Sequence, residues 1–219
     1  MRKINGIELF SGSGNLSSSF KSNGHNFISL DIRKRKGICM PDIHKNILDI
    51  SSLELTRSLG SEKVDVLFIG LPCDIWSYAS GGFHLDKDFN PLTEKCSIHL
   101  EIFNKCLALI WEISPALYFI ENPRGKLRHY PPFLEFLNNT QGLCHTLTMS
   151  SYGFSTTKPT NVFTNAKGLV FKELDSFGRG AKCTSSFDNL TKSQRQKYPE
   201  LFCQVIVNFC ESVNFDTFE

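Results

Sequence analysis

The segment VDVLFIG, at residues 64–70, limits the folds open to this chain more than any other feature. It is nearly continuous in apolar and β-branched residues, which is typical of a strand buried on both faces. Similar short runs lie at residues 4–10, 26–32 and 116–122, with helix-like segments between them. Strands that alternate with helices predict an α/β fold with a mainly parallel, twisted sheet and helices on both faces.

Periodicity also predicts the longer helices and the end of the chain. Residues 93–113 repeat apolar side chains at helical spacing after a capping Thr93, and residues 199–213 form an apolar final helix. The repeating side chains of the first helix are Ile98, Ile102, Cys106, Leu109 and Ile113. Residues 144–154 predict a strand, whereas 173–198 are polar without periodicity and predict a small irregular excursion. Without repeats or a clear linker, we expect one catalytic domain over residues 1–219.

The composition indicates the class of protein but does not identify a ligand. The formal net charge is +2, so the overall charge argues neither for nor against a polyanionic partner. Basic clusters occur at 31–37 and 121–129, and a solvated surface is the simplest interpretation of each. The eight cysteines show no CxxC and no zinc spacing, and the sequence shows neither a secretory signal nor a membrane-length apolar run. We therefore expect a soluble cytoplasmic protein with reduced thiols, no metal site and no membrane partner.

Four chemically distinctive features follow the predicted strands. They are the Gly-rich turn 11–14, Asp31, the Pro72-Cys73 pair and the Glu121-Asn122 pair. In open parallel sheets, ligands bind at the carboxyl ends of the strands. These features are therefore expected to meet at one edge of the sheet.

The first two features suit a nucleoside-like cofactor. Glycines let the backbone at 11–14 turn sharply and approach a ligand beside a helix N-terminus. A carboxylate at Asp31 can accept hydrogen bonds from two ribose hydroxyls, the alternative being an ordinary exposed aspartate. Asp49 follows a third predicted strand, where it could reach an adenine amine or cap a helix.

The other two features suggest a nucleophile beside an acid. Pro72 stiffens the loop that carries Cys73, although a lone cysteine at this position is also compatible with inert packing. A nucleophilic cysteine acts as its thiolate, which requires nearby positive charge or a helix N-terminus. Glu121 ends a buried strand, and desolvation favours the protonated carboxyl group. A thiol next to a proton donor suggests addition to an electron-poor ring.

These motifs resemble those of DNA cytosine-5 methyltransferases, most closely the short type found among phage and prophage genes. IELFSGSGNLSSSF resembles the S-adenosylmethionine loop, and GLPCDIWS resembles the Pro-Cys nucleophile motif. FIENPRGKLR resembles the Glu-Asn motif, and SYGFSTTKPTNVFTN resembles a phage-type segment. The four occur in order over residues 4–165, with a weaker echo in SQRQKYPELF.

The resemblance implies a Rossmann-like methyltransferase fold that uses S-adenosyl-L-methionine on double-stranded DNA. Cys73 would add to C6 of a flipped-out cytosine, while Glu121 would hold the N3 and N4 edge and supply a proton. C5 would then accept the methyl group. By the same resemblance, Pro72, Ser77 and Asn122 would support the pocket, and Arg124 and Lys158 would hold O2 or phosphates. The implied cofactor contacts are Phe10, Ser11, Gly12, Gly14, Asp31, Ile32, Asp49, Ile50 and Leu71.

The sequence also departs from the family pattern. Leu71 replaces the first proline of Pro-Pro-Cys, Glu8 stands where aspartate is common, and Lys158 is the only cation where larger members carry Gln-x-Arg-x-Arg. Glu8 could approach the cofactor's amino group if it faces inward. Because little of the chain follows Asn165, a reduced target-recognition region is expected. Residues 78–95 and 173–198, or a protein partner, would then supply recognition.

Three other functions are compatible with parts of the pattern. An RNA cytosine-5 methyltransferase would use the same chemistry. A catalytically idle homologue would keep the fold and bind nucleic acid or a protein partner. A nicotinamide-dependent dehydrogenase would account for the Gly-rich turn and Asp31, but it leaves Cys73 and Glu121 unexplained and lacks the full GxGxxG spacing.

Overall fold

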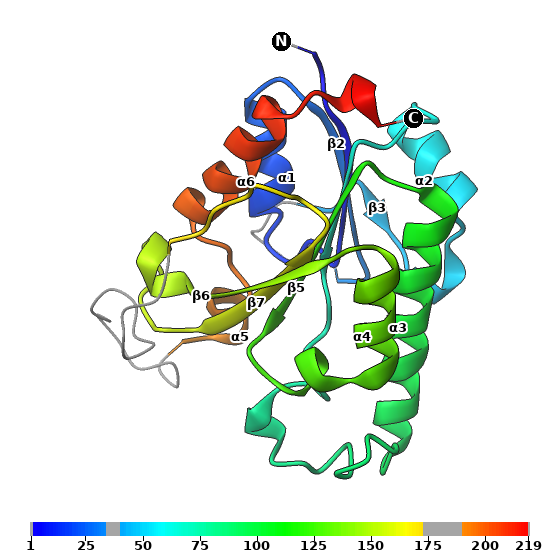
Figure 1. Cartoon of the computed structure of the whole chain (residues 1–219), viewed down its shortest axis with the longest axis vertical. Coiled ribbons are helices and arrows are strands. Elements are labelled where there is room, and N and C mark those ends of the chain that lie inside the picture. Colours follow the sequence, from blue (N-terminus) through cyan, green and yellow to red (C-terminus); the bar gives the residue numbers. More distant parts are fainter. Residues whose placement is uncertain (1, 34–39, 173–189, 219) are drawn as a thin grey trace.

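The computed structural model describes residues 2–33, 40–172 and 190–218. Within them, seven strands form one sheet in the order β3-β2-β1-β4-β5-β7-β6 (Figure 1). The strands are β1 Asn5–Leu9, β2 Asn26–Asp31, β3 Ile43–His44, β4 Val66–Gly70, β5 Leu117–Pro123, β6 Leu143–Thr148 and β7 Pro159–Thr164. The first five pair in parallel, and β7 runs antiparallel between β5 and β6. The prediction of a mainly parallel α/β sheet is confirmed.

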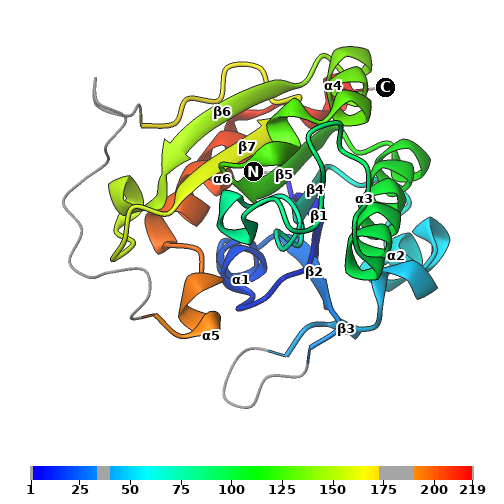
Figure 2. The same cartoon turned by 90° about the horizontal axis from the view of Figure 1, so that it is seen from below.

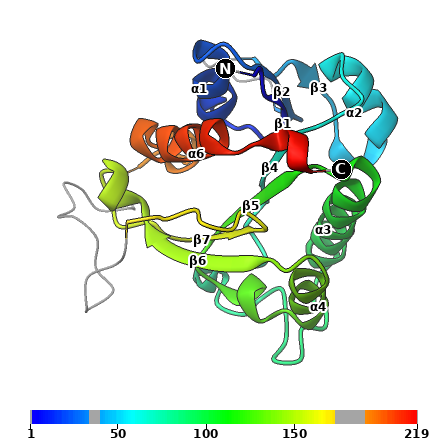
Figure 3. The same ribbon diagram turned by 45° about the horizontal axis from the view of Figure 1, so that its top comes forward.

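Helices cover both faces of this sheet (Figures 1 and 3). One face carries α1 and α6, and the other carries α2, α3 and α4. The helices are α1 Asn15–Ser22, α2 Ser52–Leu59, α3 Glu94–Ile113, α4 Pro131–Asn139, α5 Lys192–Arg195 and α6 Glu200–Ser212. Short 3-10 turns lie at Ile47–Asp49, Tyr78–Ser80, Lys126–His129, Met149–Tyr152 and Phe215–Thr217. The final helix predicted at 199–213 is thus confirmed as α6.

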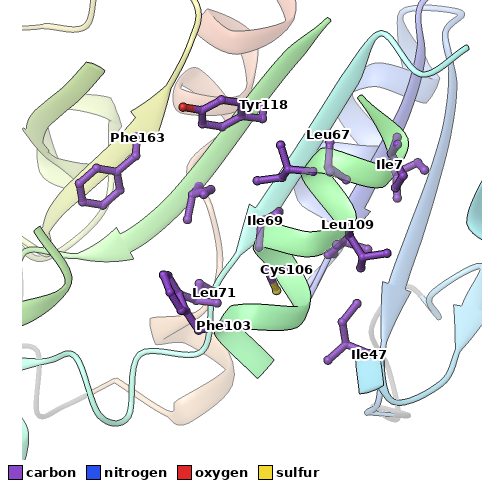
Figure 4. Packing of buried hydrophobic residues seen from close by; sticks show 14 of the residues in the cluster. Ile7, Ile47, Leu67, Ile69, Leu71, Phe103, Cys106, Leu109, Tyr118 and Phe163 are labelled. Atoms are coloured by element: carbon purple, nitrogen blue, oxygen red, sulfur yellow. The ribbon is translucent and has the colours of Figure 1, made fainter. Parts of the chain in front are cut away.

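The apolar run at 64–70 has the predicted burial on both faces. Leu67 and Ile69 of β4 point into the core beneath α3, where Figure 4 shows them near Leu109. Val66 and Phe68 point to the opposite core, against α1 and α6. Burying one such side chain contributes about 1.5–3 kcal/mol. Because its side chains enter the cores on both faces of the sheet, β4 is central to both.

The long helix α3 begins where the sequence predicted, since the backbone N–H of Cys96 donates to the Thr93 hydroxyl at 3.2 Å. Cys106 and Leu109 are buried as expected. The prediction was wrong for Ile98, which is 45% exposed. Cys96, two positions earlier in the same turn, is fully buried, and residues two apart do not share a helix face, so Ile98 faces away from the core.

The strand predicted at 144–154 is shorter than expected. β6 ends at Thr148, and Met149–Tyr152 form a 3-10 turn that closes at Gly153 with φ +92°. Met149 and Tyr152 are apolar because they are buried in the core under α6, not because the strand continues. Of the excursion predicted at 173–198, residues 173–189 lie outside the described part, which resumes just before α5; most of the basic run at 31–37 also lies outside it.

Candidate active site

The carboxyl ends of β2, β1, β4 and β5 meet at one edge of the sheet, which Figure 2 views end-on. The register places Leu9 of β1 beside Ile69 of β4, and Gly70 of β4 beside Glu121 of β5. The four features that follow the predicted strands therefore lie on neighbouring strands. This juxtaposition agrees with the prediction from the alternating pattern.

The Gly-rich turn at the end of β1 is tightly wound. Phe10, Gly12 and Gly14 all have positive φ, and the Gly14 N–H donates to the Ser11 carbonyl at 2.7 Å. The buried Ser11 also donates its N–H to Leu30 of β2 at 3.1 Å. Glycine adopts positive φ without strain, whereas a residue with a side chain would be strained there. The backbone at Gly12 and Gly14 can therefore come close to a ligand in front of α1.

Asp31 braces this turn. It is 8% exposed, its Oδ2 accepts from the Gly12 N–H at 2.9 Å, and its Oδ1 accepts from the Arg33 N–H at 2.8 Å. The alternative of an ordinary exposed aspartate is therefore wrong. The carboxylate lies directly at the turn, where its remaining lone pairs can still accept hydrogen bonds.

The other residues of the predicted cofactor set differ in exposure. Ile32 is exposed beside Asp31, whereas Ile50 and Leu71 have their side chains in the core under α2 and α3. Asp49 is exposed at the end of a 3-10 turn. It caps no helix in the described chain, because Asn46 caps that turn and Ser51 caps α2, so the capping alternative for Asp49 is wrong.

Glu8 faces α1. Its Oε2 accepts from the Ser17 N–H at 2.9 Å in the first turn of that helix. Burial raises the pKa of the Glu8 carboxyl to about 7, and the hydrogen bond from Ser17 opposes this shift. Its Oε1 is buried with no hydrogen-bond partner in the described residues.

The loop that carries Cys73 is locked to the loop after β5. The Cys73 carbonyl accepts from the N–H groups of Trp76 and Ser77 at 3.1 and 3.0 Å, which closes a turn. Ser77 then pairs with Gly125, and the Lys126 N–H donates to the Trp76 carbonyl at 2.7 Å. A Cβ at Gly125 would collide with that carbonyl oxygen, so glycine permits this close approach.

A second set of hydrogen bonds fastens the strand ends themselves. The Leu71 N–H donates to the Glu121 carbonyl at 3.1 Å, and the Asn122 side-chain amide donates to the Leu71 carbonyl at 2.9 Å. Asn122 is fully buried and Pro72 is half-buried. The side chain of Asn122 therefore fixes the path of the chain just before Cys73.

The Cys73 thiol is half-buried, and burial raises its pKa. The negative charges of Glu121 and Asp74 raise it further, while the ammonium of Lys158 lowers it. These interactions indicate that Glu121 and Lys158 lie within electrostatic reach of the thiol. In the free protein the thiol is thus held in its neutral form.

The two predicted cations, Arg124 and Lys158, lie in two segments that one backbone hydrogen bond joins. The Arg124 side chain is exposed, and its backbone N–H donates to the Pro159 carbonyl at 2.9 Å. Lys158, the residue before Pro159, has φ +34° and places Nζ over the rings of Phe154 and Tyr198 at 5.6 and 5.4 Å. The turn before β7 thereby joins the end of β5.

Glu121 has one satisfied and one unsatisfied oxygen. It is 6% exposed, and its Oε2 accepts from the Tyr198 hydroxyl at 2.8 Å. Its Oε1 is buried without a hydrogen-bond partner anywhere in the described residues. Sequence reasoning did not identify Tyr198, and the only signal for it was the weak echo in SQRQKYPELF.

The segment after Cys73 exposes large apolar side chains near this edge. Phe83 is 70% exposed and contacts the His84 ring, and Tyr78 is also exposed. The segment is tied back by the Lys126 ammonium, which donates to the Leu85 carbonyl at 2.9 Å. The described residues contain no cluster of three or more acidic, His or Cys side chains suited to a metal ion, and none of their helices is long and apolar enough for a membrane span.

Comparison with a family model assigns the class of protein. The model for C-5 cytosine-specific DNA methylase matches residues 4–157, which include the Gly-rich turn, Cys73 and Glu121. The chain therefore belongs to the C-5 cytosine-specific DNA methylase family. No curated protein matches the chain significantly.

Solved structures share the fold at low sequence identity. A protein described as a DNA modification methyltransferase encoded within an E. coli prophage has a TM-score of 0.54 and 16% identity, covering 78% of this chain and 49% of that chain. The Entamoeba histolytica methyltransferase EhMeth has a TM-score of 0.51 and 20% identity, covering 80% of this chain and 56% of that chain. This chain thus aligns with only about half the length of each relative.

We expect the reactivity of Cys73 to respond to the charges around it. Replacing Lys158 by Met removes the cation that lowers the thiol pKa, so alkylation by iodoacetamide at pH 8 slows by about two- to fivefold, as one partly screened charge allows. Asp74→Asn removes a negative charge and speeds the reaction. Peptide mass spectrometry measures Cys73 against the exposed Cys144 in the same digest. Equal Cys73 rates in all three proteins would contradict the electrostatic account.

Proposed function

We propose that this protein is a DNA cytosine-5 methyltransferase that uses S-adenosyl-L-methionine and acts on a flipped-out base. The observation that carries the proposal is the fastening of the Cys73 loop to the end of β5, through Leu71, Asn122 and Gly125, next to Glu121. A nucleophile and an acid held on adjacent strands are what addition to a pyrimidine ring requires. We further propose that the chain acts as one catalytic domain.

The turn after β1 fits an S-adenosyl-L-methionine site. The backbone at Gly12 and Gly14 offers close approach, the Asp31 carboxylate can accept from ribose hydroxyls, and the exposed Ile32 offers an apolar surface to the adenine. Ser13 contributes a buried hydroxyl oxygen that has no hydrogen-bond partner among the described residues. When bound there, the cofactor supplies an electrophilic methyl group.

Cys73 is the proposed nucleophile. As a thiolate, its Sγ forms a bond to C6 of the cytosine, and the displaced electrons make C5 nucleophilic toward the methyl group. Burial and an ionised Glu121 raise the thiol pKa, and a protonated Glu121 would remove the second of these two effects. The ammonium of Lys158 is the nearby charge that favours the thiolate.

Glu121 is the proposed acid and later the proton acceptor. Its protonated carboxyl gives a proton to N3 as the bond from Cys73 to C6 forms, which neutralises the negative charge that would otherwise develop on N3. After methylation, a base such as water removes the proton on C5. The bond between Sγ and C6 then breaks, and N3 returns its proton to Glu121. Both groups are thereby restored.

The remaining site residues have supporting roles in this proposal. Pro72 and Asn122 hold the nucleophile loop in its shape. Arg124, whose side chain is exposed, is suited to a phosphate, and Lys158 is suited to the cytosine O2 or a phosphate. Base flipping requires a surface that follows the duplex, and the exposed aromatic residues of 78–95 lie next to Cys73 in the sequence. A protein partner would extend recognition.

We expect the wild-type protein to place labelled methyl groups from S-adenosylmethionine into 5-methylcytosine of unmethylated genomic DNA, and Cys73→Ala to place none while still binding S-adenosylhomocysteine. The matched control, Cys144→Ala, removes an exposed thiol and retains activity. Digestion to nucleosides identifies the product.

Turnover by Cys73→Ala above about one per cent of wild type would contradict the nucleophile assignment. Label in RNA instead of DNA would support the RNA alternative. Binding of S-adenosylhomocysteine without methyl transfer to either nucleic acid would support the idle homologue.

Glu121→Gln is expected to slow single-turnover methyl transfer by about 100-fold or more, because the amide cannot deliver the proton to N3. The change removes one ionisable group at nearly constant size. Rapid-quench measurements at saturating DNA report the chemical step directly. A change confined to KM would show that Glu121 binds the base without acting as its acid.

A further inference from the structure

Tyr198 contacts Glu121 but has no role in the proposed reaction steps. It lies two residues before α6, is 5% exposed, and donates its hydroxyl hydrogen to Glu121 Oε2 at 2.8 Å. Gly70, which opposes Glu121 in the sheet, leaves room for this hydroxyl. A Cβ at Gly70 would lie 2.8 Å from the Tyr198 oxygen. The absence of a side chain on β4 thus permits the contact.

The Tyr198 ring is held on several sides. Its edge meets Phe68 of β4 and its ring tilts against Phe202 of α6, both with centroids 5.5 Å apart. The Asn15 side chain donates to the Tyr198 carbonyl at 2.8 Å, and the Lys158 ammonium lies over the ring. The hydroxyl therefore has little freedom to leave Glu121.

We propose that Tyr198 is a positioning residue that keeps the acid proton of Glu121 on Oε1, the oxygen left for the cytosine. This inference rests on the proposed function, because it concerns the same proton transfer. It assigns a role to a residue of the segment SQRQKYPELF, for which the sequence predicted none.

The directionality of the hydrogen bond supports this assignment. A proton on Oε2 would face the hydrogen that Tyr198 already donates there, whereas a proton on Oε1 meets no donor from the described chain. Burial, and then the charge of an ionised Glu121, raise the pKa of the Tyr198 hydroxyl well above its ordinary value, so the phenol keeps the hydrogen that it donates to Glu121.

The same contact stabilises the product of proton transfer. When Oε1 gives its proton to N3 as Cys73 Sγ bonds to C6, the carboxylate that remains is buried. Tyr198 then makes a charge-assisted hydrogen bond to it, which is stronger than the bond to the neutral acid. The difference lowers the barrier to addition, and the proton returns to Glu121 when Sγ leaves C6.

Tyr198→Phe tests the proposal because it removes only the hydroxyl and keeps the ring under Lys158. Hydrogen bonds to charged groups have net effects that correspond to about a tenfold to 100-fold change, so the single-turnover rate on unmethylated genomic DNA should fall by at least tenfold. KM for DNA and the affinity for S-adenosylhomocysteine should stay within about twofold. The matched control is Tyr152→Phe, which removes another hydroxyl from the same core, one that accepts from the Lys172 N–H.

A double-mutant cycle separates positioning from general stability. In a Glu121→Gln background, adding Tyr198→Phe should cost less than about threefold, because the group that Tyr198 serves is already gone. Multiplicative losses, a rate equal to wild type, or a faster Tyr198→Phe enzyme would each overturn the proposal. The last result would mean that the phenol obstructs the base.

The methylation activity of the wild-type protein distinguishes failure of the proposed function from failure of the role proposed for Tyr198. A wild-type protein that methylates neither DNA nor RNA overturns the proposed function, and the role of Tyr198 falls with it. An active wild-type protein with an unaffected Tyr198→Phe variant overturns only the role of Tyr198.

Discussion

The parallel pairing of β4 with β5 is the constraint on which the rest of the site depends. Its register sets Gly70 opposite Glu121, so that one strand leads into the Cys73 loop beside the carboxyl group that ends the other. A one-residue slip would turn Glu121 to the opposite face of the sheet. Burial of β4 in both cores makes such a slip costly, because each of its side chains would exchange one packed environment for another.

Polar contacts then convert this register into a rigid site. The Asn122 side-chain amide and the backbone around Gly125 contact backbone groups of the Cys73 loop, so their effect does not depend on flexible side chains of the loop. Tyr198 reaches the same edge from the start of α6 and satisfies one oxygen of Glu121. The site thus combines the ends of two neighbouring strands with a residue from the far end of the chain, and it leaves one carboxyl oxygen for a ligand.

Local patterns predicted the parts of the molecule that local physics determines. The apolar run at 64–70, the Thr93 cap and the polar residues after each strand could all be read from the sequence because short-range spacing encodes them. The turn at 149–152 could not, since buried apolar residues look alike in a strand and in a turn. The contact between Tyr198 and Glu121 joins residues 77 positions apart, and only the packing of α6 against the sheet brings them together.

The most direct measurement traps the bond between Cys73 and DNA. Duplexes in which 5-fluorocytosine replaces cytosine carry fluorine at C5, where a base needs a proton to remove, so Sγ cannot leave C6 after methylation. With S-adenosylmethionine present, we expect a stable adduct, and mass spectrometry of the digest should locate the nucleotide on the peptide that contains Cys73. An adduct on another cysteine, or none from a protein that methylates ordinary DNA, would show that Cys73 is not the nucleophile.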